Sequence, residues 1–247
     1  MLKLALVGYG KMGKAIEQLA ASQGHQVVAR LTSSEQPINA PMLHQADVAI
    51  EFTRPEAALN NVEQLLALSI PVVLGTTGWS HELERLALLV EAHQGALVYG
   101  ENFSLGMVLF SRLVEQAALL CSSFSQYDLL LWELHHRTKR DAPSGTALRL
   151  AEKVIQKSST KQSMTKPLEG DLVQEQLQVA SLRCGSAIGT HTLLIDSPWD
   201  RMTLQHEAKS REGPARGALF AAEWICHKRG LYPFEAAIDD YCEEAHS

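Results

Sequence analysis

The sequence predicts an α/β protein in which an N-terminal, doubly wound parallel sheet is combined with a second, α+β domain that holds a mixed sheet. In the first hundred residues, short apolar runs alternate with segments whose leucines and alanines recur at helical spacing. Strands that alternate with helices in this way form a parallel sheet with crossover helices. After residue 176 the pattern changes to three runs that alternate apolar and polar residues, with turns between them. Such runs are typical of an antiparallel or mixed sheet with one covered face.

The composition narrows the class of protein. The chain has 247 residues, 46% hydrophobic and 20% charged, which is typical of a soluble globular protein with one large or two modest domains. A net charge of -6 argues against nucleic-acid binding as the main role. The four cysteines form no CxxC pair and have no metal-ligand spacing, which indicates reduced thiols. No signal peptide or membrane span is evident. We expect a cytoplasmic enzyme with no membrane or nucleic-acid partner.

The N-terminus carries a glycine motif in a specific context. Residues 2–7 (LKLALV) read as a strand, residues 14–21 as a helix, and between them lies G-x-G-x-x-G. In the dinucleotide-binding (Rossmann) motif, the first glycine makes the turn, the second admits a pyrophosphate and the third lets helix and strand pack closely. A plain strand–turn–helix is the alternative. The residues concerned are Gly8, Tyr9, Gly10, Lys11, Met12 and Gly13.

Further strands are expected at residues 26–31, 46–52, 71–74 and 97–99, with helices at 55–68 and 81–92 between them. A doubly wound sheet binds its ligand at the carboxyl ends of its strands. Polar residues follow each strand, and together they would line one crevice, although each also suits a turn or a helix cap. These positions are Thr32, Ser33, Ser34; Phe52, Thr53, Arg54; Gly75, Thr76, Thr77; Glu101, Asn102 and Phe103.

The end of the second strand bears on the choice of cofactor. An NAD site usually places an acid there to bind the ribose 2'-hydroxyl, whereas a 2'-phosphate requires that the acid be absent. Here Thr32 and Ser33 end the strand and the nearest acid, Glu35, comes late. With Lys11 and Arg54 nearby, the sequence favours NADPH over NADH without excluding use of both. The alternative is that Glu35 turns into the site.

The second half begins with a helix at residues 104–120 that is apolar on more than one side. A Lys/Ser/Thr-rich segment at 157–171 is expected to be an exposed loop. The alternating runs are 176–183, 189–195 and 201–207, and a helix follows at 215–229, ended by Gly230 and Pro233. We expect a dinucleotide-binding domain at 1–104 and 213–247, and a substrate-binding and oligomerisation domain at 105–212.

Residues 133–146 (ELHHRTKRDAPSGT) combine adjacent histidines, basic side chains and a Ser-Gly-Thr turn within fourteen residues. An apolar strand is expected before them at 127–132 and a helix after them at 147–155, so they form a strand-to-helix loop. A histidine suits proton donation near neutral pH, and basic side chains bind carboxylates. The following helix N-terminus also favours an anion. We expect a pocket for a small polyanion with an acid catalyst; the alternative is a solvated loop with an ordinary helix cap.

The motif E-x-H-H-x-x-K-x-D-A-P-S-G-T-A in this loop closely resembles the signature of the 4-hydroxy-tetrahydrodipicolinate reductase family, also called dihydrodipicolinate reductase. Other elements fit in order: the glycine motif, FTRP at 52–55, GTTG at 75–78, NFSxG at 102–106, GxHT at 189–192 and HxAxSR at 206–211. The resemblance spans nearly the whole chain. It implies a Rossmann domain plus a mixed-sheet domain through which four subunits associate, and NAD(P)H-dependent reduction of a cyclic dicarboxylate in lysine and diaminopimelate synthesis.

The resemblance also implies roles for individual residues. His135 corresponds to the proton donor, Lys139 to a second donor that neutralises a substrate carboxylate, and His136 to a substrate-binding histidine. Gly145 and Thr146 correspond to donors for the other carboxylate. The segments 8–13, 75–77 and 100–103, the last beginning at Gly100, would hold the cofactor. No metal is expected, because adjacent residues on an extended segment such as His135 and His136 point to opposite sides.

The chain departs from the family pattern at three places. Its glycine loop is one residue shorter, Thr32 and Ser33 replace an acidic and a basic residue, and Glu101 stands where small or apolar residues are common. Two other functions remain open at this point. One is a nicotinamide reductase of another small dicarboxylate, and the other is a catalytically inactive sensor that keeps the cofactor fold.

Overall fold

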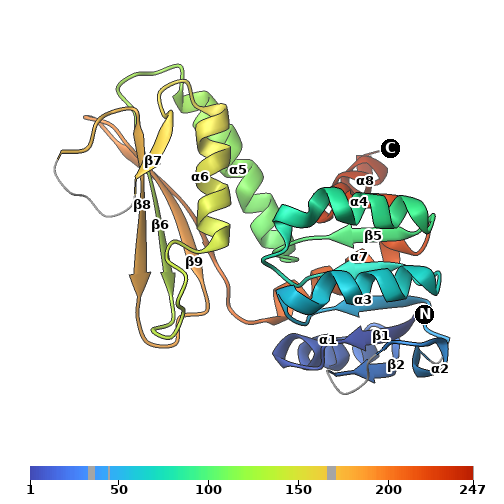
Figure 1. Ribbon diagram of the computed structural model, residues 1–247. Coiled ribbons are helices and arrows are strands. Elements are labelled where there is room, and N and C mark those ends of the chain that lie inside the picture. Colours follow the sequence, from blue (N-terminus) through green and yellow to red (C-terminus); the bar gives the residue numbers. More distant parts are fainter. Residues whose placement is uncertain (33–36, 44, 166–170, 247) are drawn as a thin grey trace. The chain divides into compact units, whose positions relative to one another are not determined.

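The computed structural model describes residues 1–32, 37–43, 45–165 and 171–246. The chain forms two compact units (Figure 1). The first unit comprises Met1–Leu105 and Arg211–Ser247, and the second comprises Gly106–Ser210. None of the helices in the described ranges combines the length and the apolar character needed to cross a bilayer.

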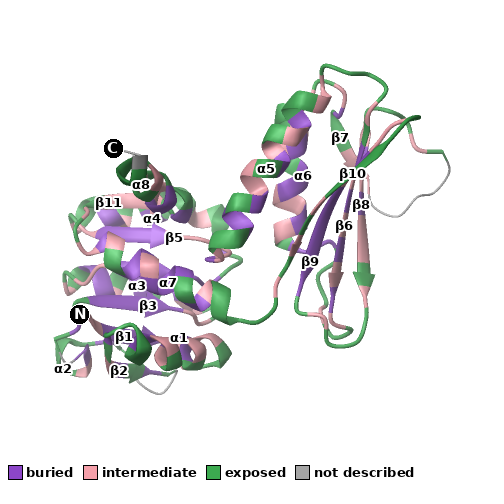
Figure 2. Cartoon of the chain, turned by 180° about the vertical axis from the view of Figure 1, so that it is seen from behind, coloured by how far each residue is buried: buried purple, intermediate pink, exposed green. Residues whose placement is uncertain are grey.

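The first unit is built on a six-stranded sheet in the order β11-β5-β4-β3-β1-β2, in which every pairing is parallel. Its central strands are almost fully buried (Figure 2), because helices cover both faces of a parallel sheet. The strands are β1 (Lys3–Val7), β2 (Gln26–Leu31), β3 (Val48–Glu51), β4 (Val72–Leu74), β5 (Ala96–Tyr99) and β11 (Gly230–Pro233).

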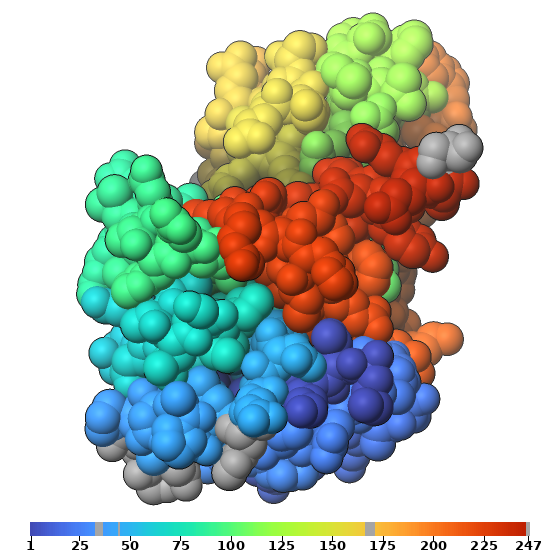
Figure 3. Space-filling view, turned by 90° about the vertical axis from the view of Figure 1, so that its right-hand side faces the viewer, coloured from blue at the N-terminus to red at the C-terminus, as the bar shows by residue number. Residues whose placement is uncertain are grey.

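The helices of this unit come from both ends of the chain. Helix α7 (Glu212–Ile225) packs against α1 (Lys11–Ser22) and against β3, β4 and β5. Figure 3 shows the C-terminal segment, in red, beside the N-terminal segments, in blue. The other helices are α2 (Ala40–Leu43), α3 (Pro55–Ala67), η1 (Ser80–Glu82), α4 (Leu83–Ala92) and α8 (Phe234–His246). The C-terminal segment therefore completes the fold of the N-terminal one.

The second unit has a five-stranded sheet in the order β10-β9-β6-β8-β7. Strand β6 pairs antiparallel with β9 and parallel with β8, so the sheet is mixed. The helices α5 (Leu105–Cys121) and α6 (Gly145–Lys157) cover one face (Figure 1). The strands are β6 (Asp128–His135), β7 (Ser163–Thr165), β8 (Gln176–Arg183), β9 (Thr190–Asp196) and β10 (Arg201–Glu207).

The predicted fold class is confirmed, with several differences in the elements. Strand β6 continues to His135 because its alternation goes on through pairing with β8 and β9, so the loop begins later than expected. Helix α7 ends at Ile225, and the segment expected to end it forms β11 instead. The expected loop at 157–171 contains β7 and the buried Lys161, whose ammonium donates to two carbonyl oxygens. Helix α8 was not predicted.

Candidate active site

The residues predicted to bind the cofactor gather at one edge of the first sheet. Because all six strands run parallel, their carboxyl ends lie at the same edge. The segments 8–13, 52–53, 75–77 and 100–103 follow β1, β3, β4 and β5 there, and Thr32 follows β2. Ser33 and Glu35 lie outside the described residues.

The glycine loop has the steric features of a phosphate-binding turn. Gly8 has a φ of +96°, and a Cβ on it would lie 2.1 Å from the carbonyl oxygen of Phe52. A Cβ on Gly13 would lie 2.5 Å from the carbonyl oxygen of Gly8, whereas one on Gly10 would meet nothing within 4 Å. Each glycine thus has the role expected from the motif: a tight turn, an open approach and close helix packing.

Helix α1 begins at Lys11, three residues earlier than predicted, so Lys11 and Met12 lie in its first turn. Its N-cap, Gly10, provides no side-chain cap, and no acidic residue stands in the first turn. The helix therefore presents backbone N–H groups and its positive dipole end to the opening above Gly10. A dinucleotide pyrophosphate fits this position by its charge and by the space available.

The loops after β3 and β4 are joined through a buried carboxyl group. Thr53 donates its backbone N–H to Thr76 Oγ1 at 2.7 Å and its hydroxyl to Glu51. Asn61 Nδ2 also donates to Glu51 Oε1, at 3.2 Å. Glu51 is fully buried, and burial raises its pKa, although these hydrogen bonds oppose the rise. This residue fixes the geometry of two predicted cofactor loops. Thr77 is exposed beside them.

The loop after β5 is fixed by aromatic packing. Phe103 is buried and its ring lies 4.6 Å from that of Phe234 and 6.2 Å from that of Phe52, measured between centroids. The side chain of Phe103 is thus part of the core of the first unit. Glu101 and Asn102 are half-buried, and Asn102 Oδ1 accepts the backbone N–H of Ser104 at 2.9 Å.

A cationic cluster lies beside the glycine loop. The Tyr9 hydroxyl donates to Glu17, and the hydrogen bond raises the pKa of Tyr9. Arg30, on β2, pairs with the same carboxylate through Nε at 2.8 Å. The guanidinium carbon of Arg30 and the ammonium of Lys14 each lie 5.9 Å from the centroid of the Tyr9 ring. Two cations and one carboxylate leave this cluster, the Tyr9 cluster, with a net positive charge.

The second unit places a buried glutamate at the centre of the histidine motif. Glu133, on β6, has no exposed surface. Its Oε1 accepts hydrogen bonds from the backbone N–H of Ser144 at 2.9 Å and from Arg183 Nη2 at 3.0 Å. Its Oε2 lies 3.2 Å from His135 Nδ1 and 3.7 Å from His191 Nε2. One carboxylate therefore contacts β6, β8, β9 and the start of α6.

These contacts decide the charge state of the cluster. Burial favours the neutral form of Glu133, but hydrogen bonds from His135, Ser144 and Arg183 outweigh it and hold its pKa well below the ordinary range. For His191, burial and the neighbouring His135 lower the pKa to about 4. At neutral pH Glu133 is thus an anion, and His191 is a neutral ring.

The loop after β6 carries the other predicted substrate residues. His136 Nδ1 lies 2.8 Å from Thr138 Oγ1, and Lys139 Nζ lies 2.8 Å from Asp141 Oδ2. The lysine lowers the pKa of Asp141 against the effect of burial. Arg183 donates to the carbonyl oxygens of Lys139 and Asp141, at 3.3 and 2.5 Å, which anchors the loop to β8. The side chains predicted to bind a carboxylate therefore lie on one segment, which Arg183 holds against β8 through hydrogen bonds.

Helix α6 begins at Gly145, and Ser144 caps it by accepting the backbone N–H of Ala147 at 3.2 Å. Gly145 is exposed and Thr146 is half-buried, so both lie at the surface of the helix N-terminus. His135 is 8% exposed, and a Cβ on Gly189 would lie 2.9 Å from its Nε2. Glycine at position 189 thus leaves that nitrogen uncovered.

Sequence reasoning did not select Glu133, Arg183 or His191, although the first opens the motif and the last lies in GxHT. Only the sheet register brings them together: Glu133 pairs with His191, and His135 with Arg183. Glu133, His135 and His191 also offer donor atoms within 4.8 Å of one another, a spacing compatible with a metal ion. Because Arg183 and the Ser144 backbone already occupy one oxygen of the single carboxylate, we interpret the cluster as a hydrogen-bonded site.

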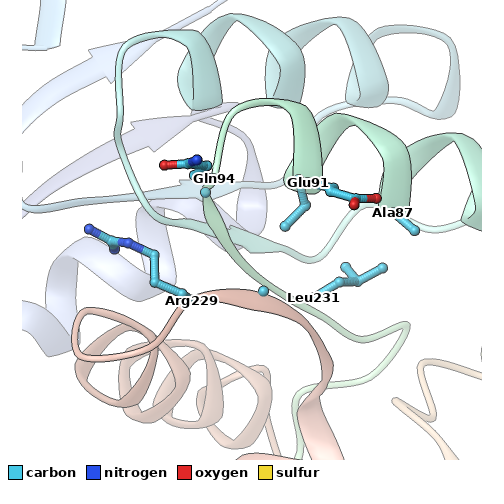
Figure 4. A pocket seen from close by; sticks show the side chains of 8 residues that line it. Ala87, Glu91, Gln94, Arg229 and Leu231 are labelled. Atoms are coloured by element: carbon cyan, nitrogen blue, oxygen red, sulfur yellow. The ribbon is translucent and has the colours of Figure 1, made fainter.

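A cavity of about 450 Å³ lies elsewhere on the first unit (Figure 4). Glu91 and Gln94 line it on one side, and Arg229 and Leu231 on the other. Leu231 belongs to β11, which pairs in parallel with the beginning of β5. The cavity therefore lies toward the amino ends of the strands, away from the edge at which such sheets bind cofactors.

Comparisons with known proteins agree along nearly the whole chain. Residues 2–103 match the family model described as dihydrodipicolinate reductase, N-terminus, and residues 106–238 match the one described as dihydrodipicolinate reductase, C-terminus. The 4-hydroxy-tetrahydrodipicolinate reductase of Christiangramia forsetii is 33% identical over 239 residues, which cover 97% of this chain and 98% of the relative. That of Archaeoglobus fulgidus is 35% identical over 256 residues, covering 95% and 96%.

Among solved structures, a dihydrodipicolinate reductase from Paenisporosarcina with bound dipicolinate has a TM-score of 0.73 at 23% identity, covering 94% of this chain and 97% of the other. An amine dehydrogenase from Mycobacterium smegmatis has a TM-score of 0.59 at 10% identity, covering 93% and 94%. At these identities the two structures bear on the fold alone.

Proposed function

The chain belongs to the dihydrodipicolinate reductase family, and from that premise we propose which of its residues bind the cofactor, bind the substrate and supply the proton. The protein is an NAD(P)H-dependent oxidoreductase that reduces 4-hydroxy-tetrahydrodipicolinate to tetrahydrodipicolinate, with loss of water, in lysine and diaminopimelate synthesis. Its substrate is a cyclic dicarboxylate.

We assign cofactor binding to residues 1–104 and 213–247, and substrate binding to 105–212. When bound, the nicotinamide supplies the hydride. The glycine loop and the N-terminus of α1 would bind the pyrophosphate, as the opening above Gly10 supports. Thr53, Thr76 and the segment 100–103 would position the nicotinamide end, held in place by Glu51 and by the packing of Phe103.

We propose that NADPH is preferred to NADH. No acid follows β2 directly at Thr32 or Ser33, and the Tyr9 cluster places Arg30 and Lys14 beside the glycine loop. A 2'-phosphate carries charge that these cations would stabilise, whereas a free 2'-hydroxyl gains little from them.

The substrate residues divide between the two carboxylates and the reacting ring. Lys139 would pair with one carboxylate in place of Asp141, and the backbone of Gly145 and the hydroxyl of Thr146 would bind the other at the positive end of α6. His136 would contact the substrate, with its ring oriented by Thr138. This pairing of a fixed cation with a helix N-terminus matches a ligand that carries two negative charges.

His135 would donate the proton. Hydride addition at the fourth ring carbon leaves electron density on the neighbouring carbon and the ring nitrogen, and an acid must protonate that carbon to complete the reduction. The observation that carries this role is the position of His135: its ring is nearly buried at the end of β6, and its Nε2 faces the space that Gly189 leaves open.

We also propose that the uncovered face of the second sheet joins subunits of a homotetramer. Leu130, Trp132 and Leu134 alternate with the residues that face α5 and α6, and Leu134 pairs with Leu182, which is 50% exposed. Large apolar side chains on an uncovered sheet face favour burial against another copy. Sedimentation of the purified protein tests the assembly.

We propose a cytoplasmic location for the protein. The four cysteines all lie within the described ranges and form no disulfide, which agrees with a reducing compartment.

The assay for the proposal measures cofactor oxidation with substrate formed in the cuvette by a synthase that condenses pyruvate with aspartate semialdehyde. We expect oxidation that depends on the synthase, with a higher kcat/KM for NADPH than for NADH. A higher value for NADH would refute the cofactor preference. Binding of both cofactors without turnover would instead favour an inactive sensor, and turnover only with another dicarboxylate would favour a different reductase.

A further inference from the structure

Two buried polar atoms face each other inside the second unit. Glu133 Oε2 and His135 Nδ1 lie 3.2 Å apart, and neither has another hydrogen-bond partner among the described residues. The other carboxylate oxygen of Glu133 is already occupied by the backbone N–H of Ser144 and by Arg183. Because an unpaired buried polar atom is unfavourable, the two atoms satisfy each other best if Nδ1 carries a proton and donates it to Oε2.

The remainder of the ring environment agrees with this tautomer. His135 Nε2 points toward Gly189, where any Cβ would lie at 2.9 Å. The neighbouring His191 approaches the same Oε2 less closely, at 3.7 Å, and its Nε2 also lies 3.4 Å from Ser144 Oγ. Glu133 thus has a shorter contact with His135 than with its other histidine neighbour.

We propose that Glu133 is the positioning residue for His135: its carboxylate accepts a hydrogen bond from Nδ1–H and so directs Nε2, with the proton to be transferred, toward the substrate. This inference rests on the proposed function of His135. In the step itself, the Nε2–H bond breaks as a C–H bond forms on the substrate ring. The histidine is left neutral, with a proton on Nδ1 that still donates a hydrogen bond to Glu133, and solvent restores the Nε2 proton between turnovers. Through this contact the anion stabilises the imidazolium that must form before each transfer.

Other titratable and charged groups surround Glu133 and His135 and also affect the pH dependence of kcat. They are Arg183 on β8, His191 on β9, His206 on β10, and the paired Lys139 and Asp141 in the loop. Burial lowers the pKa of both His191 and His206, so neither adds a positive charge at neutral pH. Glu133 is therefore the nearest source of negative charge for the His135 ring.

Glu133→Gln tests the proposal, because it keeps the shape of the side chain and removes the charge. We expect kcat to fall roughly 100-fold and the basic limb of the kcat profile to move about one pH unit lower, because the imidazolium is less stable without the anion. The KM for NADPH should stay within about twofold. Glu115→Gln is the matched control: it removes a carboxylate that pairs with Lys153 at 2.7 Å between α5 and α6 of the same unit. Glu115→Gln should leave the basic limb of the kcat profile at the same pH as in the wild type.

A measurement on the unmodified enzyme covers the case in which Glu133→Gln does not fold. Nitrogen-15 NMR of the imidazole rings, with the His135 signals identified by their loss in His135→Gln, should show the Nδ1–H tautomer when the ring is neutral. The Nε2–H tautomer, or an unmoved basic limb in folded Glu133→Gln, would overturn the proposal for Glu133. If His135→Gln itself retained the limb and most of the turnover, the proposed role of His135 would fail instead. Synthase-dependent oxidation by the wild type tests the overall function independently.

Discussion

His191 should give the protein a measurable loss of stability in mildly acidic solution. Its ring is 5% exposed and lies among His135, Glu133, His206 and Lys139. Burial, followed by the neighbouring His135, lowers the pKa of His191 from 6.5 to about 4. Because the pKa in the folded state is the lower one, the unfolded chain binds the proton first as the pH falls. The stabilising contribution is thus present above pH 6.5 and is lost progressively as the pH falls toward 4.

The two pKa values set the size of the effect. With 6.5 in the unfolded chain and about 4 in the folded one, the free energy of unfolding should decrease by about 2 kcal/mol between pH 7 and pH 5. Burial also lowers the pKa of His206, which adds to the loss in the same direction. Glu133 contributes little in this interval, because its carboxyl group is ionised in both states above pH 5.

Urea unfolding followed by circular dichroism at pH 7 and pH 5, at one protein concentration, measures this difference. His191→Asn removes the titrating ring, so its own difference between the two pH values should be smaller than that of the wild type by about 2 kcal/mol. The variant will be less stable at pH 7 because polar contacts are lost, but the comparison uses only the change with pH. Equal pH differences in wild type and variant would refute the reasoning.

Three further perturbations test the site and the fold. Lys139→Ala should reduce kcat/KM for the dicarboxylate about 100-fold while the Kd for NADPH, measured by fluorescence, stays nearly unchanged; an equal loss of cofactor affinity would contradict its assignment to the substrate. Arg30→Ala should raise the KM for NADPH about tenfold and leave that for NADH unchanged, in the coupled assay with each cofactor. Gly217→Ala should lower the free energy of unfolding by about 3 kcal/mol, since its Cβ would lie 1.7 Å from the carbonyl oxygen of Phe103. An unchanged urea midpoint would refute that contact.

The sequence was sufficient for the fold class and for most strands because the apolar periodicity of each element is local. It predicted β2, β8 and β10 at the observed bounds. It failed where neighbours in space decide the structure. Residues 230–233 form a strand only because they pair with β5, and β6 extends to His135 because β8 and β9 continue beside it. Register is non-local, so no motif could show that Glu133 lies opposite His191.

Two fully buried glutamates, Glu51 and Glu133, show why burial alone does not define a role. Glu51 receives hydrogen bonds from a hydroxyl and an amide, and no cation or histidine is among the causes of its shift, so burial raises its pKa. Glu133 is equally buried, yet an arginine, a backbone N–H and a histidine hold its pKa far below the ordinary value. A carboxyl group that is kept easily protonated can brace loops, but it stabilises a neighbouring cation poorly. Glu133 keeps its negative charge at neutral pH, and a cationic proton donor requires that property in a buried neighbour.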